Sequence, residues 1–329
     1  MIDFFNSWWC ELAGRGWEAV VLHSWQELPQ NIESDIDYAV RGPKPPELLR
    51  LLAGHARHHG WRLVQVIEHE PDAFFCVCQQ ATPPFDSLQL DVAWSYRRLG
   101  HSLVPGELLF ENHRAAAGKA FRVPSPGSEF TYLLAKAAAK GKEFGKIRER
   151  ATSLLAEDPE GCREIASKAF GNTLESGASI MDWEIWFASA PAFGPIRHGR
   201  RFGTEECKLC LRRIVHPTGY KLTLGLSPSD PAVSRVTDKL RPSFREVVNG
   251  NLVTSLNRLR LPLHLIRTRL VVEADQAKVS DDSEVAAATR AIQSLADRMD
   301  RRLAHHEHKR GSSWQKTCSQ TATSSPDHD

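Results

Sequence analysis

The chain has 329 residues, a formal net charge of +2 and 41% hydrophobic residues, which is enough apolar material for the cores of two domains. The near-neutral charge argues against a surface that coats nucleic acid, and no apolar run approaches the length of a membrane span. Seven cysteines are too sparse for a disulfide scaffold, and the amino-terminal stretch lacks the basic start of a secretory signal. We therefore expect a reduced, cytoplasmic protein.

The first third of the chain alternates short strands with helices. Apolar residues recur at helical spacing over residues 2–14, which predicts an amphipathic helix, and Pro46 is placed to begin a second helix that runs to residue 59. Strands are predicted at residues 17–23, 35–40, 61–69, 73–80 and 87–94. Together these elements predict an α+β fold with a mixed sheet and flanking helices.

The remainder of the chain is predicted to be mainly helical. Helices are expected at 129–157, at 161–170, around Trp183 and Trp186, and at 231–241, 251–270 and 283–309, with one strand at 218–226. The polar end, from residue 311 on, is expected to be disordered. The predicted organisation is a sheet domain (1–125), a helical domain (126–195), a further segment (196–310) and a tail (311–329).

Three aspartates of the first third are candidate metal ligands. Asp35 and Asp37 are two residues apart on a predicted strand, so both side chains point to one face. Asp91 lies on a later predicted strand, and it can lie across from the pair if the two strands are neighbours. Crowded carboxylates repel one another unless a cation neutralises them, and hard oxygen ligands favour Mg²⁺.

The end of the first predicted strand is a candidate phosphate site. Ser24 follows Leu22 and His23 there, and a tight strand-to-helix turn at this point would present free backbone N–H groups to a triphosphate. The Ser24 hydroxyl would add one more donor.

These residues carry a resemblance to a known family. The stretch VVLHSWQELPQNIESDIDYAV followed downstream by LQLDV resembles the nucleotidyltransferase-fold superfamily, in which an apolar strand ends in Gly-Ser or Gly-Gly, an Asp-x-Asp strand follows about ten residues later, and a third Asp lies on a later strand. The resemblance is nearest to nucleotidyltransferase-like proteins of bacterial surface-polysaccharide gene clusters and covers about residues 15–150.

The resemblance implies a Mg²⁺-dependent transfer of a nucleotidyl group from a nucleoside triphosphate (NTP) to a hydroxyl or phosphate acceptor. By position, Asp35, Asp37 and Asp91 would bind metal and carry the catalysis, and Ser24 would contact the triphosphate. A basic helix after the sheet faces the nucleotide in the family, which suggests Lys136 and Lys140, two neighbours on one helix face. The acceptor would be a sugar, a lipid-linked molecule or a protein.

One residue departs from the family pattern. His23 stands where the family has Gly, and a Cβ at that place can hinder the approach of the backbone to a phosphate. This departure favours an alternative in which the chain is a non-catalytic scaffold or regulatory protein that kept the fold. A protein-modifying nucleotidyltransferase of the toxin or antitoxin type is a third reading.

The second half resembles a degenerate thymidylate-kinase-like domain. The stretch RRIVHPTGYKLTLGLSPSDPAVSRV (212–236) has the flank of a phosphate loop, but Pro231, Ala232 and Val233 stand where the working loop has Gly-Lys-Ser or Gly-Lys-Thr. We therefore expect a degenerate P-loop-like segment that does not bind ATP in the family's way. The basic stretch 197–213 has little aromatic interleaving, so it gives no strong nucleic-acid signal.

Overall fold

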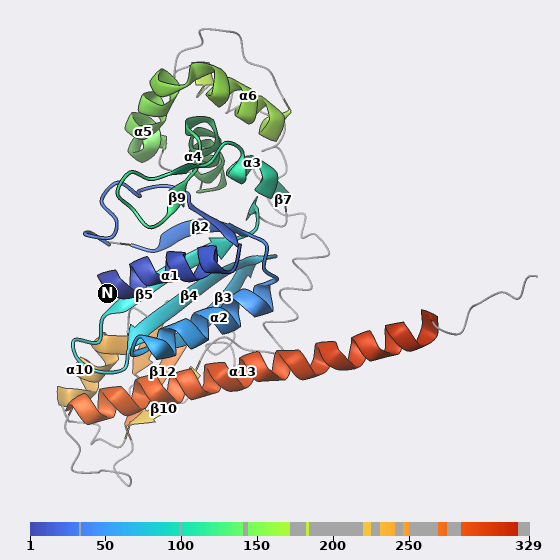
Figure 1. Ribbon diagram of the computed structural model, residues 1–329. Helices are drawn as coiled ribbons and strands as arrows, with labels where there is room; N and C mark the ends of the chain where they lie inside the picture. The colour runs from blue at the N-terminus through green and yellow to red at the C-terminus, as the bar shows by residue number, and fades with distance from the viewer. Residues whose placement is uncertain are drawn as a thin grey trace, which may run out of the picture.

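Figure 1 shows the protein as a computed structural model. The structure describes residues 1–32, 34–98, 101–140, 144–171, 182–183, 220–224, 231–240, 246–249, 269–274 and 284–321. Its helices are α1 (Ile2–Gly14), α2 (Pro45–His58), α3 (Gly106–Phe110), α4 (Pro126–Lys140), α5 (Phe144–Glu157), α6 (Pro159–Phe170), α10 (Pro231–Leu240) and α13 (Glu284–Thr321).

The strands of the first half form a mixed sheet. They are β1 (Glu18–Val21), β2 (Ile36–Arg41), β3 (Trp61–Glu70), β4 (Ala73–Gln80), β5 (Ser87–Ala93), β8 (Arg114–Ala115) and β9 (Arg122–Val123), in the order β3-β4-β5-β2-β1-β9-β8. The β2–β5 and β1–β9 pairs are parallel and the others are antiparallel. A separate hairpin joins β6 (Tyr96–Arg98) to β7 (His101–Val104). The expected α+β class with a mixed sheet is therefore confirmed.

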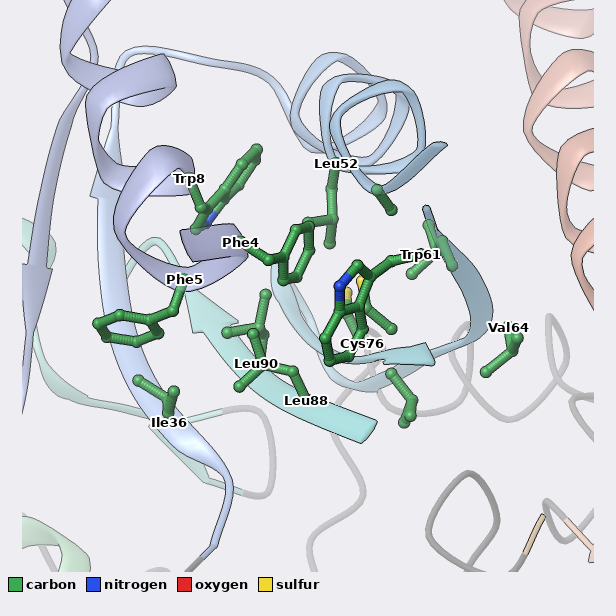
Figure 2. Close-up of a cluster of buried hydrophobic side chains, with 14 of the residues drawn as sticks. Phe4, Phe5, Trp8, Ile36, Leu52, Trp61, Val64, Cys76, Leu88 and Leu90 are labelled. Carbon is green, nitrogen blue, oxygen red and sulfur yellow. The ribbon is translucent and has the colours of Figure 1, made fainter. Parts of the chain in front are cut away.

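One face of this sheet is covered by α1 and α2 (Figure 1). Figure 2 shows Phe4 and Trp8 of α1 and Leu52 of α2 gathered with Trp61 above Leu90 of β5. The rings of Phe4 and Trp61 stack with centroids 4.9 Å apart, and all five side chains are almost fully buried. Burial of each such side chain contributes about 1.5–3 kcal/mol, so this face anchors the sheet.

The opposite face is covered by α4 and α3, with α5 and α6 beyond α4 (Figure 1). Val20 and Leu22 at the end of β1 and Ala39 of β2 pack there with Phe130 and Leu134 of α4. Alternation along the strands sends their neighbours to the α1–α2 face instead. The α4 face is the one that receives the candidate site.

Where the structure describes the second half, it consists of a small parallel sheet and the helices α10 and α13. Its strands are β10 (Tyr220–Leu224), β11 (Glu246–Asn249) and β12 (Arg269–Ala274), in the order β10-β12-β11. Helix α13 packs against α2 and β3, and its side chains Ile292 and Leu295 join the same apolar core as α1 and α2. Side chains of α10, among them Val236 and Leu240, join this core as well.

The elements predicted for the first half agree with the structure to within a few residues, but the second half differs in three places. β11 and β12 were not expected, and β12 begins at Arg269, where a helix through residue 270 was predicted. Val271 and Val272 lie just past the end of the predicted helix, and their high strand propensity favours the strand that the structure shows there. The structure also continues α13 to Thr321, across most of the stretch expected to be disordered, and no proline precedes Pro326 to stop it.

Candidate metal centre

The two strands that carry the aspartates are neighbours. β2 and β5 run parallel, with Asp37 directly opposite Asp91. Ile36 and Tyr38 point into the α1–α2 core, so Asp37 points to the α4 face by alternation. Asp35, just before β2, continues the same series. The ladder therefore places the three aspartates as the sequence predicted.

The three carboxylates converge. One oxygen from each of Asp35, Asp37 and Asp91 lies within 4.8 Å of the others, and all three residues are half-buried. Among the described residues, this is the group whose side chains could hold a metal ion. Three carboxylates bring three negative charges, a donor set that suits a hard divalent cation such as Mg²⁺. The site therefore has the ligand chemistry that the resemblance implies.

Helix α4 delivers two donors to Asp37 from one of its faces. The Tyr132 hydroxyl donates to Oδ1 of Asp37 at 3.0 Å, and one helical turn later Nζ of Lys136 donates to Oδ2 at 3.0 Å. Only 16% of the Lys136 side chain and 13% of the Asp37 side chain are exposed. The expectation that Lys136 faces the site is met in position. Lys140 follows on α4, but its side chain is outside the described part of the structure.

His23 reaches the same carboxylate from β1. The Leu22 N–H donates to the Asp37 carbonyl at 2.9 Å, which holds the end of β1 beside the acid. Nε2 of His23 then lies 2.8 Å from Oδ2 of Asp37, and Nδ1 lies 2.7 Å from the Ser24 hydroxyl. Because a carboxylate accepts only, Nε2 carries the proton and donates. The His23 side chain thus lies at the margin of the aspartate cluster.

The backbone conformation does not require glycine at position 23. The residue with a left-handed conformation is Ser24, with φ 53°. No helix follows it in the described part of this segment: residues 26–30 form turns, so the strand-to-helix turn expected here is absent. Pro29 lacks the backbone N–H that a helix interior needs. The described residues that follow Ser24 therefore offer no helix amino terminus to a phosphate, although the Ser24 hydroxyl stays exposed.

A buried residue of the helical region, Glu129, and a half-buried one, Arg150, hold this turn segment in place. Arg150 of α5 binds both carboxylate oxygens of Glu129 at 2.7 and 2.6 Å, and Nε1 of Trp25 donates to Glu129 at 3.2 Å. The Arg150 guanidinium also lies over the Trp25 ring. On the other side, Nζ of Lys119 donates to the Leu28 carbonyl. The segment is thus anchored at both ends.

A cavity of about 360 Å³ opens between this turn segment and the start of β2. Its lining includes His23, Ser24, Glu27, Asn31 and Asp35. It therefore adjoins the exposed hydroxyl on one side and one carboxylate of the triad on the other. A small polar ligand that entered it would meet both.

The charges of the triad are compensated unevenly. Burial by itself would raise the pKa of Asp37, but hydrogen bonds and charge from His23 and Lys136 outweigh burial and hold that pKa far below its ordinary value. Burial, followed by repulsion from Asp37 and Asp91, raises the pKa of Asp35. Among the described residues, no side chain donates to the Asp35 carboxylate. Asp35 is therefore the acid that most needs a cation.

Sequence reasoning missed two contacts of the site. Nε2 of His69 lies 2.8 Å from Oδ1 of Asp91. His69 lies in a register shift between Glu68 and Glu70 of β3, and such an irregularity re-aims a side chain in a way that strand alternation does not reveal. Tyr132 was missed because its role depends on how α4 is placed over the sheet, which no local motif encodes.

Several predicted features lie outside the described residues. They include Trp186, the basic stretch 197–213 and the loop segment 225–230. Helix α10 begins at Pro231, the first of the residues that depart from the phosphate-loop motif.

A search against family models, curated proteins and solved structures found no match to this chain. In the described part of the chain, no helix is both long and apolar enough to span a bilayer.

Proposed function

We propose that the chain is a divalent-metal-dependent nucleotidyltransferase-like enzyme that transfers a nucleotidyl group from an NTP to a hydroxyl or phosphate acceptor. The observation that carries the proposal is the convergence of Asp35, Asp37 and Asp91 within 4.8 Å on adjacent parallel strands. Three carboxylates at such distances repel one another, and a bound divalent cation would remove that repulsion.

Within this proposal, Asp35, Asp37 and Asp91 hold Mg²⁺. When bound, the ion neutralises the carboxylates and the phosphate oxygens and stabilises charge that develops in the transfer. The exposed Ser24 hydroxyl and the cavity beside Asp35 receive the triphosphate and the nucleotide. This assignment places the nucleotide on the side of the triad away from β5.

The acceptor approaches from the Asp91 side. Its oxygen forms a bond to the α-phosphorus while the bond to pyrophosphate breaks, so the reaction is an in-line displacement. Asp91, oriented by His69, takes the proton of an attacking hydroxyl. The resemblance extends the proposal to a sugar, a sugar phosphate or a lipid-linked acceptor of surface-polysaccharide synthesis, with a protein acceptor as the other class.

A second candidate function is a non-catalytic scaffold or regulator built on the same fold. The observation that favours it is the contact network of Asp37, whose carboxylate already binds His23, Lys136 and Tyr132. Such a network stabilises the fold without any metal. The absence of a helix in the described residues after Ser24 also favours the scaffold, because a helix amino terminus there would be a usual binding site for phosphate.

Calorimetry with each of the four NTPs, in the presence and absence of Mg²⁺, separates the two. The enzyme proposal predicts Mg²⁺-dependent binding that is lost in Asp35→Ala/Asp37→Ala. The matched control removes the exposed carboxylates of α6 in Glu160→Ala/Glu164→Ala and should bind like wild type. Folded wild-type protein that binds none of the four nucleotides would refute the enzyme and leave the scaffold.

A further inference from the structure

The acceptor sites of the Asp37 carboxylate are nearly all in use. Two carboxylate oxygens offer about four lone-pair positions. His23 and Lys136 both donate to Oδ2, at 2.8 and 3.0 Å, and Tyr132 donates to Oδ1 at 3.0 Å. This leaves one position, on Oδ1. A carboxylate that bridges two metal ions gives one oxygen to each, so Asp37 lacks the free oxygen for a second ion.

The ammonium group of Lys136 supplies a cation where the second ion would bind. Its Nζ donates to Oδ2 of Asp37 at 3.0 Å, and the carboxylate holds it there. The imidazole of His23 fills the space between Lys136 and Ser24, where the family Gly would leave room. The ring thereby excludes a hydrated ion from that side.

The formal charges agree with one divalent ion. The three aspartates carry −3, and the Lys136 ammonium brings +1, which leaves −2. One ion of charge +2 neutralises this remainder, whereas two would leave an excess of positive charge in the absence of nucleotide. Asp35 has no side-chain donor in the described structure, and His69 contacts one oxygen of Asp91, so both acids can supply ligands to that ion.

We propose that this centre binds a single divalent cation, through Asp35, Asp91 and the remaining position on Oδ1 of Asp37, and that the Lys136 ammonium, held by Asp37 and flanked by His23, replaces the second ion of a two-metal site. This inference rests on the proposed function, because it concerns the ion of that same site. It makes Lys136 and His23 determinants of metal stoichiometry.

The test counts Mn²⁺ ions on the full chain, by equilibrium binding with detection of free Mn²⁺ by electron paramagnetic resonance. Titrations are run with and without a non-hydrolysable NTP analogue. Wild type should bind one ion per chain in both cases. Lys136→Met/His23→Gly, which removes the ammonium and restores the family Gly, should bind two in the presence of the analogue. Lys168→Met, which removes a lysine that contacts Glu111 and Glu164 outside the site, should bind one.

The outcomes separate the inference from the function on which it rests. Two ions on wild type would overturn the inference and leave the enzyme proposal standing. A single ion on the folded double variant would also overturn it. No Mn²⁺ on wild type in either titration would refute the proposed function itself. If the double variant does not fold, the dipolar signal of wild type decides: isolated Mn²⁺ supports one ion per site, and coupled pairs contradict it.

Discussion

Replacement of Arg150 by Met should destabilise the protein far more than the loss of an ordinary surface ion pair. The change leaves the Glu129 carboxylate buried, with 1% of its side chain exposed, and removes two short hydrogen bonds. Breaking a buried ion pair costs about 3–5 kcal/mol. Arg150 keeps 29% of its side chain in solvent, so we expect a smaller loss, of about 2–4 kcal/mol.

Urea denaturation followed by far-ultraviolet circular dichroism measures this free energy of unfolding. The control is Arg114→Met, because Arg114 binds Glu157 at a similar distance of 2.8 Å while both side chains are more than 40% exposed. That change should cost less than about 1 kcal/mol. In the double variant Arg150→Met/Glu129→Gln, the buried charge is gone, so at least half of the lost stability should return.

Equal costs for Arg150→Met and Arg114→Met would refute the reasoning, since they would mean that burial of Glu129 does not matter. The absence of any recovery in the double variant would do the same. A further readout is the turn segment that Trp25 fastens to Glu129. If this clamp positions Ser24, Arg150→Met should also weaken any NTP binding that the wild type shows.

Four further outcomes follow from the site and the core. Asp35→Asn should raise the melting temperature of the metal-free protein by about 2 °C, because the burial and repulsion that raise the pKa of Asp35 are relieved; a lower melting temperature in differential scanning calorimetry would contradict this. Asp37 has a lowered pKa in the folded state, so its ion pairs stabilise the fold above the unfolded pKa of about 3.9 and are lost as the pH falls through the folded value. The stability advantage of wild type over Asp37→Asn should therefore be constant near neutral pH and shrink below about pH 4, and urea midpoints that differ equally at every pH would exclude the ion pairs as its source. Tyr132→Phe removes one donor to Asp37 and should cost about 0.5–1.5 kcal/mol in urea denaturation at neutral pH. Leu90→Ala empties a fully buried position of the sheet and should cost about 2–5 kcal/mol, as checked by the same denaturation.

The sequence predicted the three aspartates of the site because their positions follow from the alternation of side chains along strands. Asp35 and Asp37 share a face because side chains alternate every two residues, and Asp91 joins them because its apolar flanks Leu90 and Val92 place it on a buried strand. Periodicity is a local property, so it can be read without knowledge of the tertiary structure. The same reasoning gave the α1 and α2 helices and the five longer strands of the sheet.

The parts that were missed depend on contacts between distant segments. Tyr132 contacts Asp37 and Arg150 contacts Glu129 only because α4 and α5 pack together over the sheet. His69 contacts Asp91 because a register shift turns its side chain toward that acid. A strand-to-helix turn was expected at Ser24, whereas the turns that follow it are held by contacts of Trp25 and Lys119. Nothing in the local sequence specifies these partners.

The apolar core beneath α2 is shared by segments more than 200 residues apart in the chain. Ile292 and Leu295 of α13 complete the same cluster as Leu52 of α2 and Val64 of β3. A gene shortened to its first 195 codons would therefore encode a sheet domain with an uncovered apolar flank, which invites aggregation. Cover for this apolar flank is a sufficient physical reason for the chain to retain α13, independent of any chemistry in the second half.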